Sequence, residues 1–379
     1  MVNNSNVILF VVNVPEFFLS HRLPLAEAAR QSGFEVHIAT AAGSEVKVIQ
    51  ALGFIHHHVS FERSGQNPIN ELRTLLQLIG LFRRIKPSLV HLITIKPVLY
   101  GGIAARVAGV KSVVSAISGL GTVFLAESLA SKLRKCLVTR LYAVAFKQER
   151  LAVIFQNPVD RDTLITMGVL QIEQACMIPG SGVALADYPY LPEPDGKPVV
   201  VMASRLLRNK GVLEFVSAAK LLSQRGLIVD MRLIGSPDPD NPNTVTKQEL
   251  EQWVDEGYVN FLGFRKDIAA QYAAANIVCL PSYYGEGLPK SLVEAAACGR
   301  AVVTTDHPGC RDAIKPNETG LLVPVKDAVA LADAIQKLVE SPGLRKKMGT
   351  AGRALAEEAY AIEKIVAQHM EIYQELLEP

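Results

Sequence analysis

The chain has 379 residues, of which 49% are apolar and 20% are charged, and its formal net charge at pH 7 is +2. This composition excludes an intrinsically disordered chain, and the net charge does not indicate nucleic-acid binding. The length suits two domains of ordinary size, each with its own core.

The first half of the chain alternates apolar runs typical of strands with helical patterns. The expected strands are Val7–Val14, Glu35–Ala39, Leu89–Thr94, Ser112–Ala116 and Leu151–Phe155. The expected helices are His21–Ser32, Glu45–Leu52, Asn70–Ile85 and Gly101–Ala108. Such alternation predicts a parallel sheet covered on both faces. No stretch reaches membrane-spanning length.

A segment rich in proline and glycine, 179–198, is the best candidate for a linker. After it the alternation restarts at Val199. Further strands are expected at Asp230–Gly235, Val259–Leu262, Ile277–Pro281, Ala301–Thr304 and Leu321–Val323. We therefore predict an α/β fold of two Rossmann-like domains, 1–178 and 179–361, facing a cleft, with ligands at the carboxyl ends of the strands.

The five cysteines are odd in number and form no C-x-x-C pair; they are Cys136, Cys176, Cys279, Cys298 and Cys310. This pattern favours reduced thiols in the cytosol, with Cys279 and Cys298 as small core residues.

The segment Tyr283–Ala296 places Glu286 before a break at Gly287 and Pro289, and places Glu294 inside the helix that follows. Proline is favoured in the first turn of a helix, and the free N–H groups of that turn bind phosphate. Carboxylates on either side could bind hydroxyls, which suggests a site for a sugar on a nucleotide diphosphate. The spacing alone fits equally well a surface carboxylate and a Glu that neutralises the helix dipole.

Arg205 and Lys210 follow the strand expected at Val199. Arginine offers a planar fork and lysine a compact charge, and both hold phosphate oxygens well. Each could be an ordinary solvated residue at a strand end. Their occurrence in the same half as the two glutamates favours a diphosphate site.

Three motifs together resemble a known family: Arg205-x4-Lys210-Gly211, Gly263-Phe-Arg-x-Asp267, and Pro281-Ser-x3-Glu286-x7-Glu294. They are similar to those of the retaining family-4 glycosyltransferases of the GT-B fold, over essentially the whole chain. Bacterial enzymes that extend glycans on a polyprenyl-diphosphate carrier are especially similar. The resemblance also implies that the last helix, 362–379, crosses back onto the first domain.

The resemblance implies a UDP-sugar donor, with N-acetylhexosamine favoured over hexose. It implies that Arg205 and Lys210 bind the diphosphate, that Glu294 binds the ribose, and that Glu286 binds hydroxyls of the transferred sugar. The base would be held near Phe264 and Arg265. Further donor contacts are expected where the helix begins, at Gly287, Leu288, Lys290 and Ser291.

The loop expected after the first strand, Asn13–Arg22, carries no G-x-G-x-x-G, and no later strand is followed by one. This argues against a nicotinamide-dependent dehydrogenase. The loop also lacks the paired glycines of many family members. Pro15 and Arg22 are expected to contact substrate, although Arg22 equally fits an arginine on a helix surface.

We expect no metal and no other cofactor. Asp238 and Asp240 match the D-x-D metal motif of the other glycosyltransferase fold, but they sit in a turn rich in proline and asparagine, where both favour turn formation. In His56–His58, successive strand side chains would point to opposite faces, so no chelating set forms.

Relatives often carry a histidine after the strand Ser112–Ala116, where this chain has Ser118 followed by Gly119. Both residues are expected near the donor sugar. The resemblance implies a front-face retaining mechanism, in which the departing phosphate oxygen takes the acceptor's proton. Glu286 and Glu294 would then position substrate rather than act as an acid–base pair.

The segment Ser128–Arg150 combines an apolar stripe with many basic residues. The stripe consists of Leu129, Leu133, Leu137, Leu141 and Val144. The pattern suits an anionic membrane surface or a lipid diphosphate. It fits equally well a helix packed in the core with a solvated basic side. Together with the resemblance, it favours a peripheral enzyme at the cytoplasmic face of the membrane.

Three alternatives remain beside a transferase that uses a polyprenyl-diphosphate-linked glycan. A sugar-nucleotide epimerase shares the two-domain plan but is not expected to carry the Glu-x7-Glu block. A family-4 transferase could act on a soluble acceptor. An idle glycan- or nucleotide-binding protein is disfavoured, because Arg205, Lys210, Glu286 and Glu294 are all present.

Overall fold

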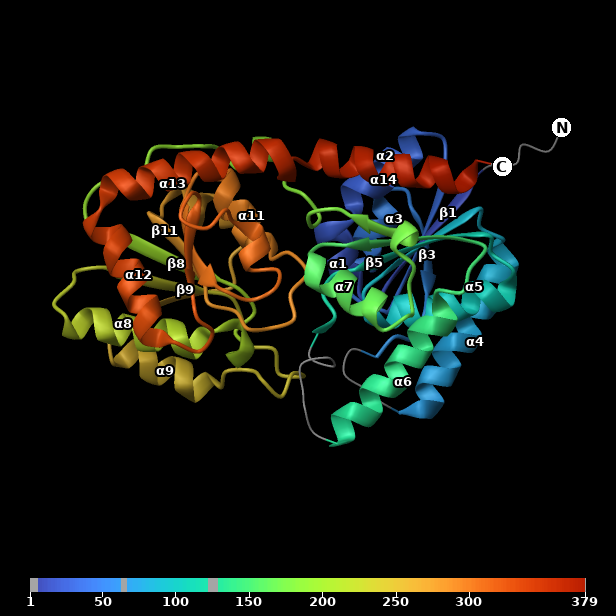
Figure 1. Cartoon of the computed structure of the whole chain (residues 1–379), viewed down its shortest axis with the longest axis horizontal. Helices are drawn as coiled ribbons and strands as arrows, with labels where there is room; N and C mark the ends of the chain where they lie inside the picture. The colour runs from blue at the N-terminus through green and yellow to red at the C-terminus, as the bar shows by residue number, and fades with distance from the viewer. Residues whose placement is uncertain (1–5, 63–66, 122–128, 379) are drawn as a thin grey trace. The chain divides into compact units, whose positions relative to one another are not determined.

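A computed structural model describes residues 6–62, 67–121 and 129–378 of the chain, with residues 129–134 described by their backbone only. The chain divides into two compact units (Figure 1). The first comprises Met1–Ser181 and Glu363–Pro379, and the second comprises Gly182–Ile362. The boundaries thus fall at 181/182 and 362/363, close to the 178/179 and 361/362 expected from the sequence.

The first unit contains a seven-stranded parallel sheet with strand order β3-β2-β1-β4-β5-β6-β7. Its strands are β1 Val7–Val12, β2 Glu35–Thr40, β3 Ile55–His58, β4 Leu89–Ile93, β5 Ser112–Ile117, β6 Arg150–Phe155 and β7 Ala175–Met177. The central strands are buried along their length because helices cover both faces, as a crossover topology requires. The predicted parallel sheet is therefore confirmed.

Helices pack on the two faces of this sheet and enclose separate apolar cores. One face carries α1 Pro15–His21, α2 Leu23–Gln31, α3 Val46–Ala51 and α14 Ile362–Leu377. The other carries α4 Pro68–Ile85, α5 Gly102–Ala108, α6 Leu129–Ala145 and α7 Pro158–Thr166. In Figure 1, α2 and α14 lie side by side above the strands, and α4, α5 and α6 lie below them.

The expected loop after the first strand is wrong: residues 15–21 form helix α1. Pro15 stands in the first turn with its fixed φ, and Glu16 complements the helix dipole there. Arg22 ends α1 and precedes α2, so the helix expected at His21–Ser32 is present as α2 and the additional helix α1 comes before it.

Helix α14 belongs to the first unit, as the resemblance implied. Its residues Ile365, Ile372 and Tyr373 are buried against the sheet. The helix is also tied by polar contacts, because the Tyr373 hydroxyl lies 2.5 Å from Nδ1 of His91 on β4. The hydroxyl of Ser112 donates to the Leu376 carbonyl at 2.7 Å.

The second unit contains a six-stranded parallel sheet with strand order β10-β9-β8-β11-β12-β13. Its strands are β8 Val199–Ala203, β9 Asp230–Ile234, β10 Asn260–Gly263, β11 Ile277–Leu280, β12 Ala301–Thr305 and β13 Gly320–Val323. Every strand expected in this half is present to within one or two residues. Cys279 and Cys298 are buried free thiols in its core, as predicted.

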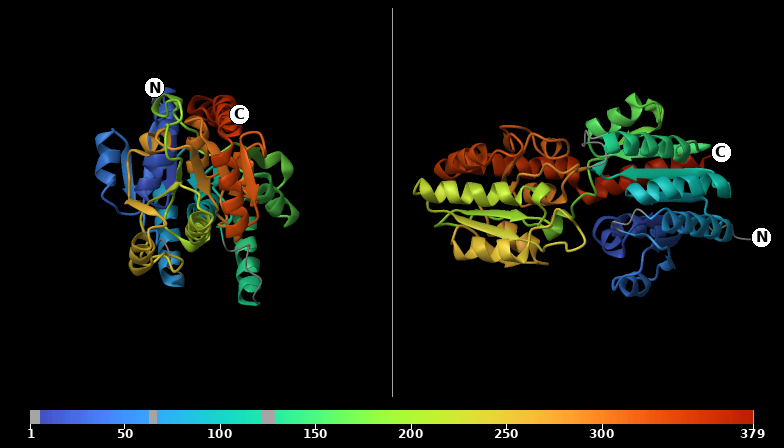
Figure 2. Two further views of the ribbon diagram at one scale, coloured as in Figure 1. Left: turned by 90° about the vertical axis from the view of Figure 1, so that its left-hand side faces the viewer. Right: turned by 90° about the horizontal axis from the view of Figure 1, so that it is seen from below.

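The helices of the second unit again lie on both faces of the sheet. They are α8 Val212–Gln224, α9 Lys247–Asp255, α10 Ile268–Ala273, α11 Lys290–Ala297, α12 Ala328–Glu340 and α13 Pro342–Leu355. Helices α8 and α9 lie on one side of β8, β9 and β11, and α11 and α13 lie on the other (Figures 1 and 2). Within the described residues, no helix of either unit has the length and apolarity needed to cross a bilayer.

The expected linker is not a loose connector, because residues 182–198 pack onto the second unit. Glu193 and Arg345 form an ion pair at 2.8 Å with both side chains 6% exposed. Arg353 donates to the carbonyl of Tyr188 at 2.9 Å, and the ring of Tyr190 lies where a side chain on Gly299 would stand. Proline and glycine shape this segment, but arginines of α13 hold it in place.

Candidate functional site

Three loops of the second unit meet at the carboxyl edge of its sheet. Strands β8 and β11 are hydrogen-bonded neighbours, so the loops that follow them meet there. Gly211 has φ +83° and stands so close to the loop after β11 that a Cβ would lie 2.1 Å from the Pro281 carbonyl oxygen. The amide of Tyr283 donates to the Asn209 carbonyl at 2.9 Å. Glycine is therefore required at position 211, where the loop that carries Lys210 approaches the segment that carries Glu286.

Lys210 and Glu286 form an ion pair at this edge, with side chains 13% and 10% exposed. The Ser282 hydroxyl donates to the same Glu286 oxygen at 2.9 Å, and the Lys210 ammonium lies 5.2 Å from the centre of the Tyr284 ring. The structure thus brings together two residues that the sequence places 76 positions apart. An anionic ligand on Lys210 would have to share that cation with Glu286.

The Glu286 segment is supported from the next loop of the sheet. Gly309 has φ +82°, and a Cβ there would meet the Gly287 carbonyl oxygen at 2.4 Å. His307, in the same loop after β12, is half-buried and faces Glu286. Burial lowers the pKa of His307, and the negative charge of Glu286 partly opposes that shift. This histidine is not among the predicted site residues, although its position after a buried strand is a usable signal.

Glu294 lies inside α11 and is 9% exposed. The Tyr188 hydroxyl donates to its Oε1 at 2.6 Å, and the Lys290 ammonium lies 3.7 Å from the same oxygen. Burial raises the pKa of Glu294, and both neighbours partly offset the shift. Tyr188 was also missed, because it lies in the segment expected to be a linker.

Helix α11 begins close to where the sequence predicts. Pro289 is the residue before the first helical turn rather than part of it, and its ring has no atom that can accept an N–H. Lys290 and Ser291 follow in the first turn, and Gly287 and Leu288 are buried behind them. The positive end of this helix therefore lies next to the Glu286 segment.

Arg205 follows β8 with its side chain 45% exposed and donates to Asp238 at 3.3 Å. Asp238 lies in a turn, since its carbonyl accepts from the Asn241 amide at 2.9 Å, and its carboxylate also pairs with Arg205 from the loop after β9. The two loops are packed tightly, because a Cβ on Gly235 would lie 1.8 Å from the Ser204 carbonyl oxygen. Asp238 balances Arg205 as Glu286 balances Lys210.

Phe264 and Arg265 follow β10 at the same edge of the sheet. The ring of Phe264 is 69% exposed. Arg265 donates two hydrogen bonds to Asp267, at 2.8 and 2.7 Å. An exposed aromatic ring beside this turn is available to stack on a planar ligand such as a nucleobase.

The residues expected at the site from the first domain lie within the first unit. Pro15 follows β1 and is buried, with the loop after β2 so close that a Cβ on Gly43 would meet its Cγ at 2.7 Å. Ser118 and Gly119 follow β5 at the carboxyl edge. Gly119 has φ +100°. Within the part of the chain that the structure describes, the Ser118 hydroxyl oxygen is buried and has no hydrogen-bond partner.

Arg22 is not on a helix surface, because it is only 2% exposed. It donates to the His21 carbonyl at 3.0 Å. Burial lowers the pKa of Arg22 to about 10, and its charge acts on His91, His369 and Tyr373. The predicted contact between Arg22 and substrate stays a prediction, but the residue lies against α14.

Helix α6 satisfies both interpretations of the basic segment in part. Tyr142 is buried in the core, and Leu141 packs against that core. Leu137 and Val144 are 58% and 42% exposed. The side chains of Leu129 and Leu133 lie outside the described residues.

On β3, His56 contacts Thr40 and His57 contacts His37, both at 2.9 Å, so neighbouring histidines point to different partners.

The site of the second unit can hold an anion and hydroxyl groups side by side. Arg205, Lys210 and the first turn of α11 supply positive charge, and Glu286 and Glu294 supply acceptor oxygens. The cations are balanced by carboxylates, since Asp238 pairs with Arg205 and Glu286 with Lys210. Such an arrangement suits a ligand that carries both phosphates and hydroxyls.

Two family models match the chain, one on each half. Residues 7–157 match the model described as "Glycosyl transferase 4-like", and residues 189–355 match the model described as "Glycosyl transferases group 1". The second match contains Arg205, Lys210, Glu286 and Glu294.

Two curated bacterial enzymes illustrate the relatives. The N,N'-diacetylbacillosaminyl-diphospho-undecaprenol alpha-1,3-N-acetylgalactosaminyltransferase of Campylobacter jejuni is 28% identical, over 95% of this chain and 98% of that relative. The UDP-Gal:alpha-D-GlcNAc-diphosphoundecaprenol alpha-1,3-galactosyltransferase of Escherichia coli is 26% identical, over 72% and 71%. Neither is an epimerase, so that alternative finds no support here.

Among solved structures, Anabaena HepE in complex with UDP is similar to this chain. The TM-score is 0.77 with 20% identity, and the match covers 97% of this chain and 99% of that one. A likeness at this identity concerns the fold.

Proposed function

Because this chain belongs to the group 1 and 4-like glycosyltransferases and has their GT-B fold, we propose that it transfers a sugar from a UDP-sugar to a polyprenyl-diphosphate-linked saccharide. The observation that carries the donor half of this proposal is the Lys210–Glu286 pair at the carboxyl edge of the second sheet, with Arg205 after β8 and Glu294 on α11 in the same unit. These four residues are called the donor cluster below. The acceptor half is supported by two relatives whose names specify undecaprenyl-diphosphate-linked sugars. An N-acetylhexosamine is the favoured donor sugar.

We assign the donor contacts by charge. The diphosphate would bind Arg205, Lys210 and the first turn of α11. The two side chains stabilise its negative charge by their positive charge, and the helix does so by its dipole. Glu294 would accept from the ribose hydroxyls, sharing its oxygens with Tyr188. Glu286 would accept from hydroxyls of the transferred sugar, and Phe264 would stack near the base.

Transfer would proceed with retention of configuration. The bond between the anomeric carbon and the diphosphate oxygen breaks, and the acceptor oxygen forms its bond on the same face of the sugar. The acceptor's proton passes to the departing diphosphate oxygen, so no enzyme base is needed. Arg205 and Lys210 stabilise the charge that develops on the diphosphate, which is where electrostatic catalysis is most effective. These residues would perform the reaction without a metal ion.

A panel of UDP- and GDP-sugars with a short-chain polyprenyl-diphosphate disaccharide tests the proposal. We expect transfer of one N-acetylhexosamine from its UDP form, with the α-configuration retained in the product by NMR. Consumption of donor without acceptor would instead indicate an epimerase or hydrolase. Transfer only to a water-soluble saccharide would contradict the lipid-linked acceptor.

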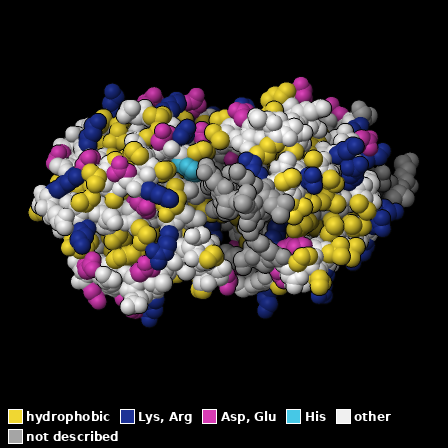
Figure 3. All heavy atoms as spheres, turned by 60° about the horizontal axis from the view of Figure 1, so that its bottom comes forward, with side chains coloured by type: hydrophobic (Ala, Val, Ile, Leu, Met, Phe, Trp, Pro, Cys, Tyr) yellow, Lys and Arg dark blue, Asp and Glu magenta, His cyan; other side chains and the backbone are white. Residues whose placement is uncertain are grey.

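We also propose that the first unit binds the membrane surface through α4 and α6. On α4, Ile69, Leu72 and Leu76 are 75%, 55% and 59% exposed and recur at helical spacing. Exposed arginines such as Arg73 and Arg140 accompany them. Figure 3 looks toward this end of the unit, where hydrophobic and basic side chains lie beside each other. An apolar stripe with basic neighbours favours an anionic bilayer.

Vesicle flotation checks this surface. Wild type is expected to float with vesicles that contain phosphatidylglycerol and to float less with phosphatidylcholine alone. The variant Leu72→Asp/Leu76→Asp should stay at the bottom of the gradient, whereas Val329→Asp, an exposed apolar residue of the second unit, should behave as wild type. Equal flotation of all three proteins would rule out α4.

A further inference from the structure

A pocket of about 540 Å³ opens at the amino edge of the sheet in the first unit. It is formed by the ends of α4, α5 and α14 and by the beginnings of β5 and β6. Ser118 and Gly119 lie beyond the opposite end of β5, and Ser118 is six residues from Ser112, or about 20 Å at ~3.3 Å per residue. The pocket is therefore separate from the carboxyl edge of the same sheet.

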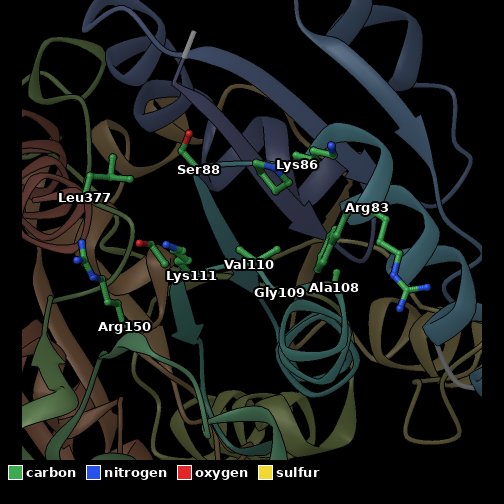
Figure 4. A pocket seen from close by; sticks show the side chains of 12 residues that line it. Arg83, Lys86, Ser88, Ala108, Gly109, Val110, Lys111, Arg150 and Leu377 are labelled. Atoms are coloured by element: carbon green, nitrogen blue, oxygen red, sulfur yellow. The ribbon is translucent and has the colours of Figure 1, made fainter. Parts of the chain in front are cut away.

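Four cationic residues line this pocket, and none of its lining residues is acidic. The cations are Arg83, Lys86, Lys111 and Arg150. Figure 4 shows them around the pocket, with Arg150 and Lys111 toward one side and Lys86 and Arg83 toward the other. Among the residues described by the structure, none of the four forms an ion pair with a carboxylate.

The two arginines have partial structural roles. Arg150 donates to the Leu376 carbonyl at 3.2 Å and also contacts the Glu378 carbonyl. Arg83 reaches the Val107 carbonyl at 3.5 Å. Each therefore binds a carbonyl near the end of a neighbouring helix and keeps further N–H groups for other acceptors.

Helix ends alone do not account for this much charge. Three helices end at the pocket, and a helix carboxyl end carries roughly −0.5 charge, so together they amount to about −1.5. The four side chains carry about +4, which leaves an excess of about +2.5. Lys86 and Lys111 are both exposed, and like charges gathered without a counter-charge repel one another.

We propose that this pocket binds a phosphate-bearing anion with two or more negative charges, such as a diphosphate. Arginine forks and lysine ammonium groups are the side chains that bind phosphate oxygens best, and the excess charge matches a diphosphate rather than a single carboxylate. The ligand is a free diphosphate compound or the diphosphate or phosphate group of a lipid. The inference stands independently of the proposed transfer reaction, because none of these residues belongs to the donor cluster.

Calorimetric titration of the full chain with inorganic pyrophosphate tests the proposal. The titration is done in a Lys210→Ala background, so that binding at the donor cluster is weakened beforehand. Adding Lys86→Asn and Lys111→Gln should raise the remaining Kd about 100-fold, since each removed charge-assisted contact is worth roughly a factor of ten. Asparagine is chosen at position 86 because Lys86 has φ +51°, which asparagine tolerates.

The matched control carries Lys47→Gln and Lys346→Gln, two exposed lysines elsewhere on the chain. It should bind pyrophosphate as the Lys210→Ala parent does, and all variants should unfold at similar temperatures. Competition by vesicles of phosphatidic acid, whose phosphomonoester carries up to two negative charges, would identify a lipid as the source of the phosphate if vesicles of phosphatidylglycerol, which carries one, do not compete. Pyrophosphate binding that neither vesicle displaces would identify a free compound. Unchanged binding after loss of Lys86 and Lys111 would overturn the proposal, as would no binding in the Lys210→Ala parent.

Discussion

The Lys210–Glu286 ion pair joins two residues to which the resemblance assigns different parts of the donor. Each neutralises the other, and Ser282 fixes the orientation of the carboxylate. A bound diphosphate would draw on the positive charge of Lys210 and leave more of the Glu286 oxygens to sugar hydroxyls. The pair is thus suited to open and rearrange as the donor binds.

Replacing Glu286 with alanine is expected to lower kcat about 100- to 1000-fold, the size of effect seen when one group that orients or stabilises the reacting centre is lost. Leaving Lys210 unpaired should reduce the free energy of unfolding by about 2–3 kcal/mol without unfolding the protein. Steady-state transfer and urea unfolding measure the two effects. The control Glu251→Ala, on an exposed face of α9, should change neither. Turnover equal to wild type in Glu286→Ala would remove Glu286 from the donor site.

Glu294 is expected to show a trade-off between stability and binding. Burial raises its pKa above 4.5, so the folded state holds this proton more tightly than the unfolded state does. Its contribution to stability is complete below pH 4.5 and is lost as pH rises through the folded-state pKa. Glu294→Gln should therefore be more stable than wild type at neutral pH and should lose that advantage below pH 4.5, by thermal unfolding.

The same variant should bind UDP about tenfold more weakly, because hydrogen bonds from the ribose to a charged acceptor are lost. Calorimetric titration with UDP measures this. Undiminished affinity would place the ribose elsewhere.

At the scale of elements, α14 is held to the first unit by an apolar face and by buried polar groups. His91, His369, Tyr373 and Arg22 gather between α14, β4 and the start of α2. Nε2 of His91 and Nε2 of His369 are buried without partners among the described residues. Such a cluster makes docking of α14 sensitive to single atoms and to pH.

Tyr373→Phe removes the hydroxyl that contacts Nδ1 of His91 and leaves that nitrogen buried without its partner. The free energy of unfolding should fall by about 1–2 kcal/mol. Chemical denaturation measures the loss, with Tyr258→Phe, a partly exposed tyrosine of the second unit, as control. Equal losses in both variants would show that the hydroxyl at position 373 has no special role.

Acid should loosen this helix. Burial lowers the pKa of His369 to about 3 from 6.5, and Arg22 adds to the shift. The unfolded state therefore binds a proton that the folded state does not, and stability is lost as pH falls from 6.5 toward 3. His369→Leu should reduce that slope by up to ~1.4 kcal/mol per pH unit, measured by urea unfolding at several pH values. An unchanged slope would assign the acid sensitivity to other groups.

At the scale of the whole molecule, the residues proposed to bind the donor all lie within the second unit. UDP should therefore protect the amides of residues 204–211 and 283–294 from hydrogen exchange. At about 100 times Kd, UDP should stabilise that unit by ~2.7 kcal/mol. Lys210→Ala should lose most of both effects. Protection confined to the first unit would contradict the assignment of the donor site.

The sequence by itself predicts the two parallel sheets, most of their strands and the loops at the carboxyl edge of the second one, whereas the short edge strand β7 is not among the predicted strands. Hydrophobic runs, glycines and prolines are local signals, so they can be recognised in the sequence alone. This is why Glu286 and the start of α11 near Pro289 were located almost to the residue.

Only the tertiary structure decided which side chains meet. Asp238 was expected to serve a turn, yet it faces Arg205, and Tyr188 was expected in a linker, yet it donates to Glu294. Arg22 looked equally suited to a helix surface and is buried against α14. Contacts between loops that are distant in sequence depend on strand order and on close packing at glycines such as Gly211. The local pattern of residues determines neither the strand order nor the packing between loops.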